Sequence, residues 1–345
     1  MYLISACPNK GQAVEVCMKL FVIFTGGTIG SSAAEDGYFS PDASKGYQLL
    51  SMYQEQKGGS VRFDTAEPYR TLSENLNGSH IAKLISCVRE NISGDYEGIV
   101  VTHGTDTIQY SAAALGYALG NDTIPVVLVS SNYILEDERA NGLENFIKAV
   151  DFIQGGYGRG VFAAYRNEGE GVTIHRGTRL IAHQPYTDAL YSVKNNYFGK
   201  YQGEEFCKNK TYREEDDKTD TLDWKWQGED SQVFCIQPCV GNCYPQIPRE
   251  TKAVILGSYH SGTINTESSA IKKFAGEARE RKIPLFLTGV SQGDAYESTK
   301  AFKSLGIQIL PEMSPTAAYM KLSMALSQGK KYQDVMPYSL GGDLA

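Results

Sequence analysis

Short apolar runs alternate along this chain with segments whose apolar residues recur at helical spacing. Runs with the length of a buried strand occur at residues 20–23, 98–102, 125–129 and 161–165. Helical patterns occupy residues 79–88, 107–119 and 137–152. Residues 171–174 are predicted to pair with 161–165 as a hairpin. This alternation predicts an α/β domain built on a parallel sheet.

The same alternation returns after a polar segment and predicts a second domain. Strands are predicted at residues 253–256, 284–288 and 308–310, and helices at 268–280, 298–305 and 315–326. A chain of 345 residues also exceeds one ordinary core. The predicted fold is therefore α/β, with a larger N-terminal parallel-sheet domain and a smaller C-terminal parallel α/β domain. The predicted division is a tail or mis-called extension at 1–17, then 18–197, a linker with a polar insertion at 198–231, and 232–345.

Three segments carry weaker patterns. Residues 31–60 are polar and glycine-bearing, so they are predicted to form a loop with a short hairpin that could act as a lid. Pro68 limits residues 62–72 to an edge strand and a turn. Ser79 is the predicted N-cap of the following helix. Trp224 and Trp226 indicate that part of the linker packs against the rest of the protein.

Composition narrows the class of protein. Charged residues make up 21% of the chain and hydrophobic ones 41%, which is ordinary for a globular protein. The net charge of −7 and the lack of a basic block argue against a nucleic-acid partner. No apolar run approaches the roughly 20 residues that span a bilayer, so no membrane association is expected.

Seven scattered cysteines and a poor match to a signal peptide favour reduced thiols in the cytoplasm. Cys235, Cys239 and Cys243 are four residues apart, which could suggest a metal cluster. Proline and glycine residues interrupt any helix that would align them, and no nearby histidine completes a zinc set. We therefore expect no metal and no cofactor.

Two strand ends carry the candidate chemistry. The first predicted strand runs into Thr25-Gly26-Gly27-Thr28, and the strand at 98–102 runs into His103-Gly104-Thr105-Asp106. Glycine permits a sharp turn without a Cβ clash, and the carboxyl ends of parallel strands form the usual ligand edge of an open sheet. Alone, the first motif could be a glycine-rich turn with an incidental threonine, and Asp106 could be a helix cap. Together they predict a site with two threonines, whose hydroxyls act as nucleophiles only beside an activating group.

Both motifs resemble the signatures of the L-asparaginase family, the amidohydrolases with two active-site threonines, and are closer to its cytoplasmic type I branch. Gly37-Tyr38 resembles the flap with its tyrosine, and Ser73-Glu74-Asn75 resembles the substrate-binding turn. The resemblance assigns residues 18–197 to the catalytic domain. It implies deamidation of L-asparagine to L-aspartate and ammonia, by a cytoplasmic homodimer or homotetramer without a cofactor.

The resemblance also implies individual roles. Thr28 is the expected nucleophile that forms an acyl-enzyme, with Tyr38 relaying its proton. Thr105 assists the attack or activates the deacylating water. Asp106 would bind the substrate α-ammonium group, as would Glu74 where relatives often have glutamine. Ser73 would hold the α-carboxylate.

One departure from the family pattern affects the mechanism. The family pattern places a lysine near Ala182, where it contacts the second threonine and the aspartate, and this stretch has none. His183 is a candidate replacement base, although it could also be a histidine that is merely hydrogen-bonded at a strand end. Lys194 is a candidate only if its loop folds back.

A second departure concerns residues 259–263, where Thr263 replaces an asparagine that approaches a neighbouring subunit's site in relatives. Two alternative functions therefore stay open. The chain could be a weakened or non-catalytic homologue that binds an amino acid, or a hydrolase of glutamine or another small amide. A subunit of a tRNA-linked amidotransferase is disfavoured, because the sequence shows no extra N-terminal domain and no basic stretch.

Overall fold

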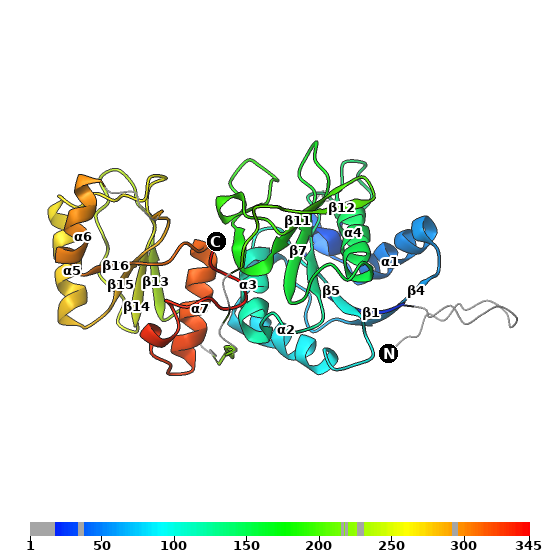
Figure 1. Cartoon of the computed structure of the whole chain (residues 1–345), viewed down its shortest axis with the longest axis horizontal. Helices are drawn as coiled ribbons and strands as arrows, with labels where there is room; N and C mark the ends of the chain where they lie inside the picture. Colours follow the sequence, from blue (N-terminus) through cyan, green and yellow to red (C-terminus); the bar gives the residue numbers. More distant parts are fainter. Residues whose placement is uncertain (1–17, 34–37, 215–216, 218–219, 226–230, 292–295) are drawn as a thin grey trace, which may run out of the picture.

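The structure is a computed structural model that describes residues 18–33, 38–214, 217, 220–225, 231–291 and 296–345. Its N-terminal half contains an eight-stranded sheet in the order β12-β11-β8-β7-β6-β5-β1-β4, counted over the described residues (Figure 1). Five neighbouring strands are parallel: β4 (Val61–Ala66), β1 (Met18–Phe24), β5 (Gly98–Thr102), β6 (Val126–Val129) and β7 (Val161–Tyr165). The predicted parallel sheet is confirmed.

The sheet ends in three antiparallel strands. β8 (Thr173–Arg176) pairs with β7 and so confirms the predicted hairpin. β11 (Gly199–Gln202) and β12 (Glu205–Lys208) follow it in the sheet. The sequence prediction placed these two strands inside the linker, which was wrong for residues 199–208. β12 is the edge strand, and β11 beside it alternates buried Gly199 and Tyr201 with the more exposed Lys200 and Gln202. The polar residues of both short strands concealed the strand pattern.

Helices cover both faces of this sheet. Leu20 and Val22 of β1 pack with α1 (Ser44–Lys57) and α4 (Gly142–Gln154). Phe21 and Ile23 pack on the opposite face with α2 (Gly78–Asn91) and α3 (Ile108–Leu119). The alternation follows from the two-residue period of a strand and explains why β1 is apolar on both faces.

Three local predictions need correction. Residues 31–60 do form a short hairpin, β2 (Ser31–Ala33) with β3 (Phe39–Pro41), but they also contain the fourteen-residue helix α1, which was not predicted. The N-cap of α2 is Asn77, whose side chain accepts hydrogen bonds from the backbone of Ser79 and His80, so Ser79 is not the cap. Helix α4 begins at Gly142, after a turn that occupies the predicted first residues.

The C-terminal half forms the predicted second parallel sheet. Its order is β13-β14-β15-β16, with strands β13 (Val233–Ile236), β14 (Ala253–Leu256), β15 (Leu285–Leu287) and β16 (Ile307–Ile309). Its helices are α5 (Ser269–Glu280), α6 (Lys300–Leu305) and α7 (Pro315–Ser327). Strand β13 was not predicted.

Helix α7 lies between the two sheets and packs against α3 (Figure 1). Lys321 of α7 and Asp343 form an ion pair at 2.8 Å, and both side chains are fully buried. Asp343 also accepts a hydrogen bond from the Tyr117 hydroxyl of α3, at 2.9 Å. The end of the chain is thus built into the contact between the two halves.

Candidate active site

The first glycine loop is held by a neighbouring segment. Gly26 and Gly27 adopt φ angles of 101° and 78°, which favour glycine. The backbone N–H of Gly27 donates to the carbonyl of Thr71 at 3.1 Å, and Thr71 donates back to Thr25 at 3.1 Å. Thr28 then opens the short 3-10 helix η1 (Thr28–Gly30), at the carboxyl end of β1. Nothing in the sequence around Thr71 indicated this supporting role.

The two glycine loops touch each other. A methyl group on Gly27 would lie 2.3 Å from the Cα atom of Gly104, so both positions require glycine. A methyl group on Gly104 would lie 2.5 Å from the Ser73 hydroxyl. Thr28 and Thr105 each follow directly after one of the touching glycines. The predicted convergence of the two motifs is therefore present in the structure.

Ser73 joins this contact from a third segment. It opens the 3-10 turn η2 (Ser73–Asn75) and its hydroxyl donates to the Asp106 carboxylate at 3.2 Å. The Thr107 hydroxyl donates to the carbonyl of Ser73 at 2.9 Å. Three segments that are far apart in sequence thus place Thr28, Ser73 and Thr105–Asp106 around one point.

The threonines of the two motifs divide into two kinds. The Thr25 hydroxyl is buried and donates to the carbonyl of Thr102 at 2.7 Å, and Thr107 is engaged with Ser73. These two hydroxyls hold the loops together. Thr28 and Thr105 are partly exposed.

His103 in the second motif is a structural residue. Its two ring nitrogens lie 2.8 Å from the carbonyl of Gly104 and 2.8 Å from the hydroxyl of Ser111. Burial lowers its pKa to about 4, so the ring is neutral near pH 7. It fixes the loop and has both nitrogens occupied.

Asp106 and Glu74 are both exposed carboxylates beside this point, on neighbouring segments. Two acidic groups next to a serine hydroxyl suit a ligand that carries an ammonium group. Tyr38 lies just before β3 on the hairpin that follows Thr28, and its side chain is 76% exposed. The structure therefore does not pack Tyr38 into the site. Residues 34–37, including the predicted flap glycine Gly37, lie outside the described residues.

His183 is the titratable residue next to Ala182, and it is close enough to Asp106 for that charge to act on its pKa. It follows β9 (Leu180–Ile181), and its ring packs edge-on against Tyr165 with centroids 5.4 Å apart. Its Nε2 atom is buried without a hydrogen-bond partner. Burial lowers the pKa of His183, while the charges of Asp188 and Asp106 act in the opposite direction. Asp188 was not among the site residues predicted from the sequence.

Lys194 is directed elsewhere. Its ammonium group forms an ion pair with Glu312 at 2.5 Å, so its loop does not fold back over the site. The structure therefore excludes Lys194 as the substitute for the family lysine in this conformation. Ala182 itself has no side chain that could take that role.

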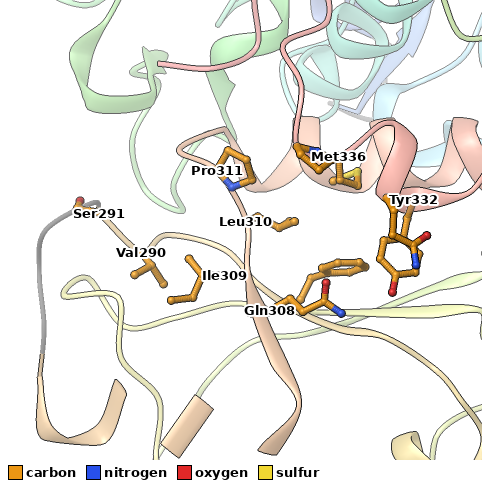
Figure 2. Close-up of a pocket in the computed structure, with 11 residues that line it drawn as sticks. Val290, Ser291, Gln308, Ile309, Leu310, Pro311, Tyr332 and Met336 are labelled. Atoms are coloured by element: carbon orange, nitrogen blue, oxygen red, sulfur yellow. The ribbon is translucent and has the colours of Figure 1, made fainter. Parts of the chain in front are cut away.

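A pocket away from the two glycine loops lies in the C-terminal half. A pocket of about 560 Å³ is lined by residues that include Phe286, Ile309, Leu310 and Tyr332 (Figure 2). Its walls are mainly apolar, and the described residues that line it include none of the candidate site residues. It lies apart from the chemistry described above.

Cys235, Cys239 and Cys243 are exposed free thiols. Among the described residues, no group of three or more His, Cys, Asp or Glu side chains could hold a metal ion. Within the same part of the chain, helices are too short or too polar to cross a bilayer.

Comparison with known proteins agrees with this geometry. Residues 19–212, more than half of the chain, match the family model described as "Asparaginase, N-terminal". The chain belongs to the asparaginase family. It is accordingly an asparaginase-like amidohydrolase, and the match spans every candidate site residue from Thr28 to His183.

Relatives of two kinds resemble this asparaginase-family chain. L-asparaginase of Thermococcus kodakarensis is 24% identical, over 95% of this chain and 99% of its own length. A glutamyl-tRNA(Gln) amidotransferase subunit from Metallosphaera sedula is 25% identical, over 92% of this chain and 74% of its own length. The relatives of this chain thus include proteins named as L-asparaginases and proteins named as amidotransferase subunits.

Solved structures share the fold. The thermostable L-asparaginase from Thermococcus kodakarensis has a TM-score of 0.75 at 24% identity, over 95% of this chain and 99% of the other. L-asparaginase I from Vibrio cholerae has a TM-score of 0.72 at 22% identity with the same coverage. A structure described as a probable cytoplasmic L-asparaginase from Campylobacter jejuni has a TM-score of 0.70 at 18% identity, over 92% and 97%. The predicted two-sheet α/β fold is confirmed.

Proposed function

We propose that this chain hydrolyses the side-chain amide of L-asparagine and releases L-aspartate and ammonia. The observation that carries the proposal is the contact between Gly27 and Gly104, which places Thr28 and Thr105 one residue beyond a shared point. The adjoining Ser73–Asp106 hydrogen bond supplies a polar binding surface at the same point.

The proposed reaction runs through an ester. The Thr28 oxygen attacks the amide carbon, the carbon–nitrogen bond breaks, and the protonated nitrogen leaves as ammonia. Tyr38 would carry the hydroxyl proton from Thr28 towards the leaving group once the hairpin covers the site. Water, activated at Thr105, then hydrolyses the ester and restores the Thr28 hydroxyl. Backbone N–H groups of the glycine loops would stabilise the oxyanion.

Substrate selection would rest on charge. Asp106 and Glu74 would bind the α-ammonium group, and the Ser73 hydroxyl would turn from Asp106 towards the α-carboxylate. The second carboxylate, from Glu74, makes binding depend more strongly on a free α-amino group in the substrate. Amides that lack that group should therefore be poor substrates.

His183 is our candidate for the base that serves Thr105. Its lowered pKa keeps the ring neutral near pH 7, and its Nε2 atom has no other hydrogen-bond partner. Asp188 and Asp106 stabilise the imidazolium form that proton uptake would create. On this proposal the missing lysine near Ala182 is replaced rather than simply lost.

A second candidate function is amide hydrolysis in support of a tRNA-linked transfer. It is favoured by the relatives that are named as glutamyl-tRNA(Gln) amidotransferase subunits. The net charge of −7 weighs against a tRNA-binding surface on this chain. Hydrolysis of glutamine or another small amide also stays open, as does binding of an amino acid without turnover.

We also propose a cytoplasmic homodimer or homotetramer with no nucleic-acid or membrane partner. The cytoplasmic location is supported by the unpaired cysteines and by the Campylobacter jejuni relative that is described as cytoplasmic. The oligomer is supported by the family resemblance alone, and sedimentation of the purified protein would test it.

The test is ammonia release from L-asparagine and L-glutamine by the purified protein and by Thr28→Ala. We expect release from L-asparagine by the wild type, and a loss of at least about 1000-fold in the variant. Thr299→Ala, on an exposed turn of the C-terminal half, is the matched control and should keep full activity. Release from L-glutamine alone would replace L-asparagine as the substrate and would fit both glutamine hydrolysis and the tRNA-linked candidate. A folded wild type that releases ammonia from neither amide would contradict the proposal.

A further inference from the structure

The hairpin that carries His183 is held partly from outside its own domain. Its strands are β9 (Leu180–Ile181) and β10 (Tyr191–Ser192), which pair antiparallel. The loop between them, residues 182–190, contains His183 and Asp188. Because the two strands are short, their own hydrogen bonds fix the hairpin only weakly. Within the N-terminal half, Asn167 exchanges two hydrogen bonds with the backbone of Leu190, and His175 lies 2.8 Å from the Ser192 hydroxyl.

Three consecutive residues at the first end of the hairpin bind the C-terminal half. The Thr178 hydroxyl donates to the carbonyl of Gly341 at 2.7 Å. The Arg179 guanidinium donates to the carbonyl of Gly342 at 2.7 Å and also to that of Leu344. The carbonyl of Leu180 accepts a hydrogen bond from the Ser314 hydroxyl at 2.5 Å. Thr178, Arg179 and Ser314 are all buried, so these bonds are shielded from water.

The second end of the hairpin binds the same half. Lys194 lies two residues after β10 and pairs with Glu312, whose backbone carbonyl also accepts from the N–H of Ala345. Lys194 and Asn195 both adopt left-handed φ angles, of 53° and 55°. Two consecutive residues seldom adopt this conformation without glycine, so outside contacts must hold the chain there.

The chain's last residues are in turn anchored in the N-terminal half. Asp343 is tied to Tyr117, and the backbone N–H of Gly342 donates to the Asp217 carboxylate at 2.9 Å. The Ser339 hydroxyl donates to the same carboxylate at 2.6 Å. Residues 339–345 therefore form a tail, buried except at its end, that is fixed on both sides.

We propose that this tail and Glu312 position the active-site loop 182–190 from both ends of its hairpin. In this arrangement Thr178, Arg179 and Lys194 are positioning residues, which act on the reaction through His183. The catalytic consequence rests on the proposed function, in which His183 serves Thr105. The anchoring of the loop does not depend on that function.

The test compares two variants that each remove one lysine ion pair. Lys194→Gln breaks the ion pair between Lys194, just after the hairpin, and Glu312. Lys200→Gln breaks the exposed ion pair between Lys200, on β11, and Glu170. Hydrogen exchange is followed in peptides that cover residues 180–192 and, as an internal reference, helix α5. Lys194→Gln should speed exchange at 180–192 at least about five-fold and leave α5 unchanged, whereas Lys200→Gln should change neither.

Kinetics supply the second readout. Lys194→Gln should lower kcat about ten-fold and change KM less than about two-fold, because Ser73, Glu74 and Asp106 stay in place. Arg179→Lys keeps the charge but loses the planar fork, and should show the same separation of kcat from KM.

Unchanged exchange at 180–192 in Lys194→Gln, or an equal change in Lys200→Gln, would overturn the anchoring. Faster exchange with unaltered kcat would overturn the catalytic role of the anchor. If the wild type hydrolysed no amide, the proposed function would fail, while the exchange measurement would still decide whether the tail holds the loop.

Discussion

At the scale of single residues, two glycines make the site. Gly27 and Gly104 lie so close that neither can carry a side chain, and the threonine after each is placed by that contact. The sequence showed both glycine–threonine pairs and predicted their meeting at one sheet edge. It could not show Thr71, which supports Gly27 through its backbone alone, because a backbone hydrogen bond leaves no mark on side-chain identity.

Gly27→Ala tests that contact. Gly58 has a nearly identical φ angle, 81° against 78°, but a methyl group there would meet open space. Gly58→Ala should therefore destabilise the protein by about 1 to 3 kcal/mol, because its φ and ψ angles of 81° and 178° lie in a region that side chains strongly disfavour. Gly27→Ala should cost about 2 kcal/mol more, because its methyl group collides with backbone. Equal denaturation midpoints for the two variants would mean that the loops are not in contact.

Buried histidines predict how stability depends on pH. Burial lowers the pKa of His103 to about 4 and that of His175 to about 3, from 6.5. Below pH 6.5 these histidines are protonated in the unfolded chain but stay neutral in the folded chain. The free energy of unfolding therefore falls as the pH falls. Each ring should cost about 2 kcal/mol between about pH 7 and about pH 5.

Urea denaturation at the two pH values measures this dependence. His103→Gln should lose about half of it, whereas His260→Gln, at an exposed position, should keep it all. A pH dependence that is the same in the wild type and in His103→Gln would show that His103 is not buried as a neutral ring.

At the scale of elements, most strands and helices followed from apolar periodicity, and the misses have physical causes. Helix α1 buries Leu49, Leu50 and Tyr53, but its serines, glutamines and lysines gave it the look of a loop. Gly46, a poor helix former, is there because a methyl group would lie 2.8 Å from the Phe24 ring. Such a requirement comes from tertiary packing, and the local sequence does not express it.

The start of α2 offers a test at this scale. Asn77 and His80 form a reciprocal capping pair, with the Asn77 side chain accepting from the helix backbone and His80 Nδ1 accepting from the Asn77 N–H. Asn77→Ala should lower stability by about 1 kcal/mol. Ser79→Ala, at the residue that the sequence pointed to, should change it by less than about 0.5 kcal/mol. The reverse order of the two thermal midpoints would place the cap at Ser79.

At the scale of the whole molecule, a large mixed sheet and a smaller parallel sheet meet across α7 and the end of the chain (Figure 1). The sequence predicted both sheets but not their connection. Lys321 and Asp343 are 22 residues apart, and their partner Tyr117 is 226 residues from Asp343. A contact at that separation cannot be read from local pattern, although a lysine within an apolar helix is unusual enough to invite a search for its partner.

Substituting Lys321 tests how much its buried ion pair with Asp343 matters for stability. Lys321→Met leaves the Asp343 charge buried without its partner and should destabilise the protein by about 3 to 5 kcal/mol. Adding Asp343→Asn should restore part of that loss, because the remaining charge disappears. Lys300→Met removes an exposed pair with Glu297 and should cost less than about 1 kcal/mol. Additive losses in the double variant would mean that the two residues are not coupled.

The proposed mechanism requires that Thr28 carries the acyl group during amide hydrolysis, and mass spectrometry can detect that group on the protein. Wild-type protein is mixed with L-asparagine, quenched in acid within the first turnovers and digested. We expect a peptide containing Thr28 that has gained the mass of an aspartyl group, and we expect no such peptide from Thr28→Ala. Ammonia release that continues in Thr28→Ala, or an aspartyl group found on Thr105, would contradict the mechanism.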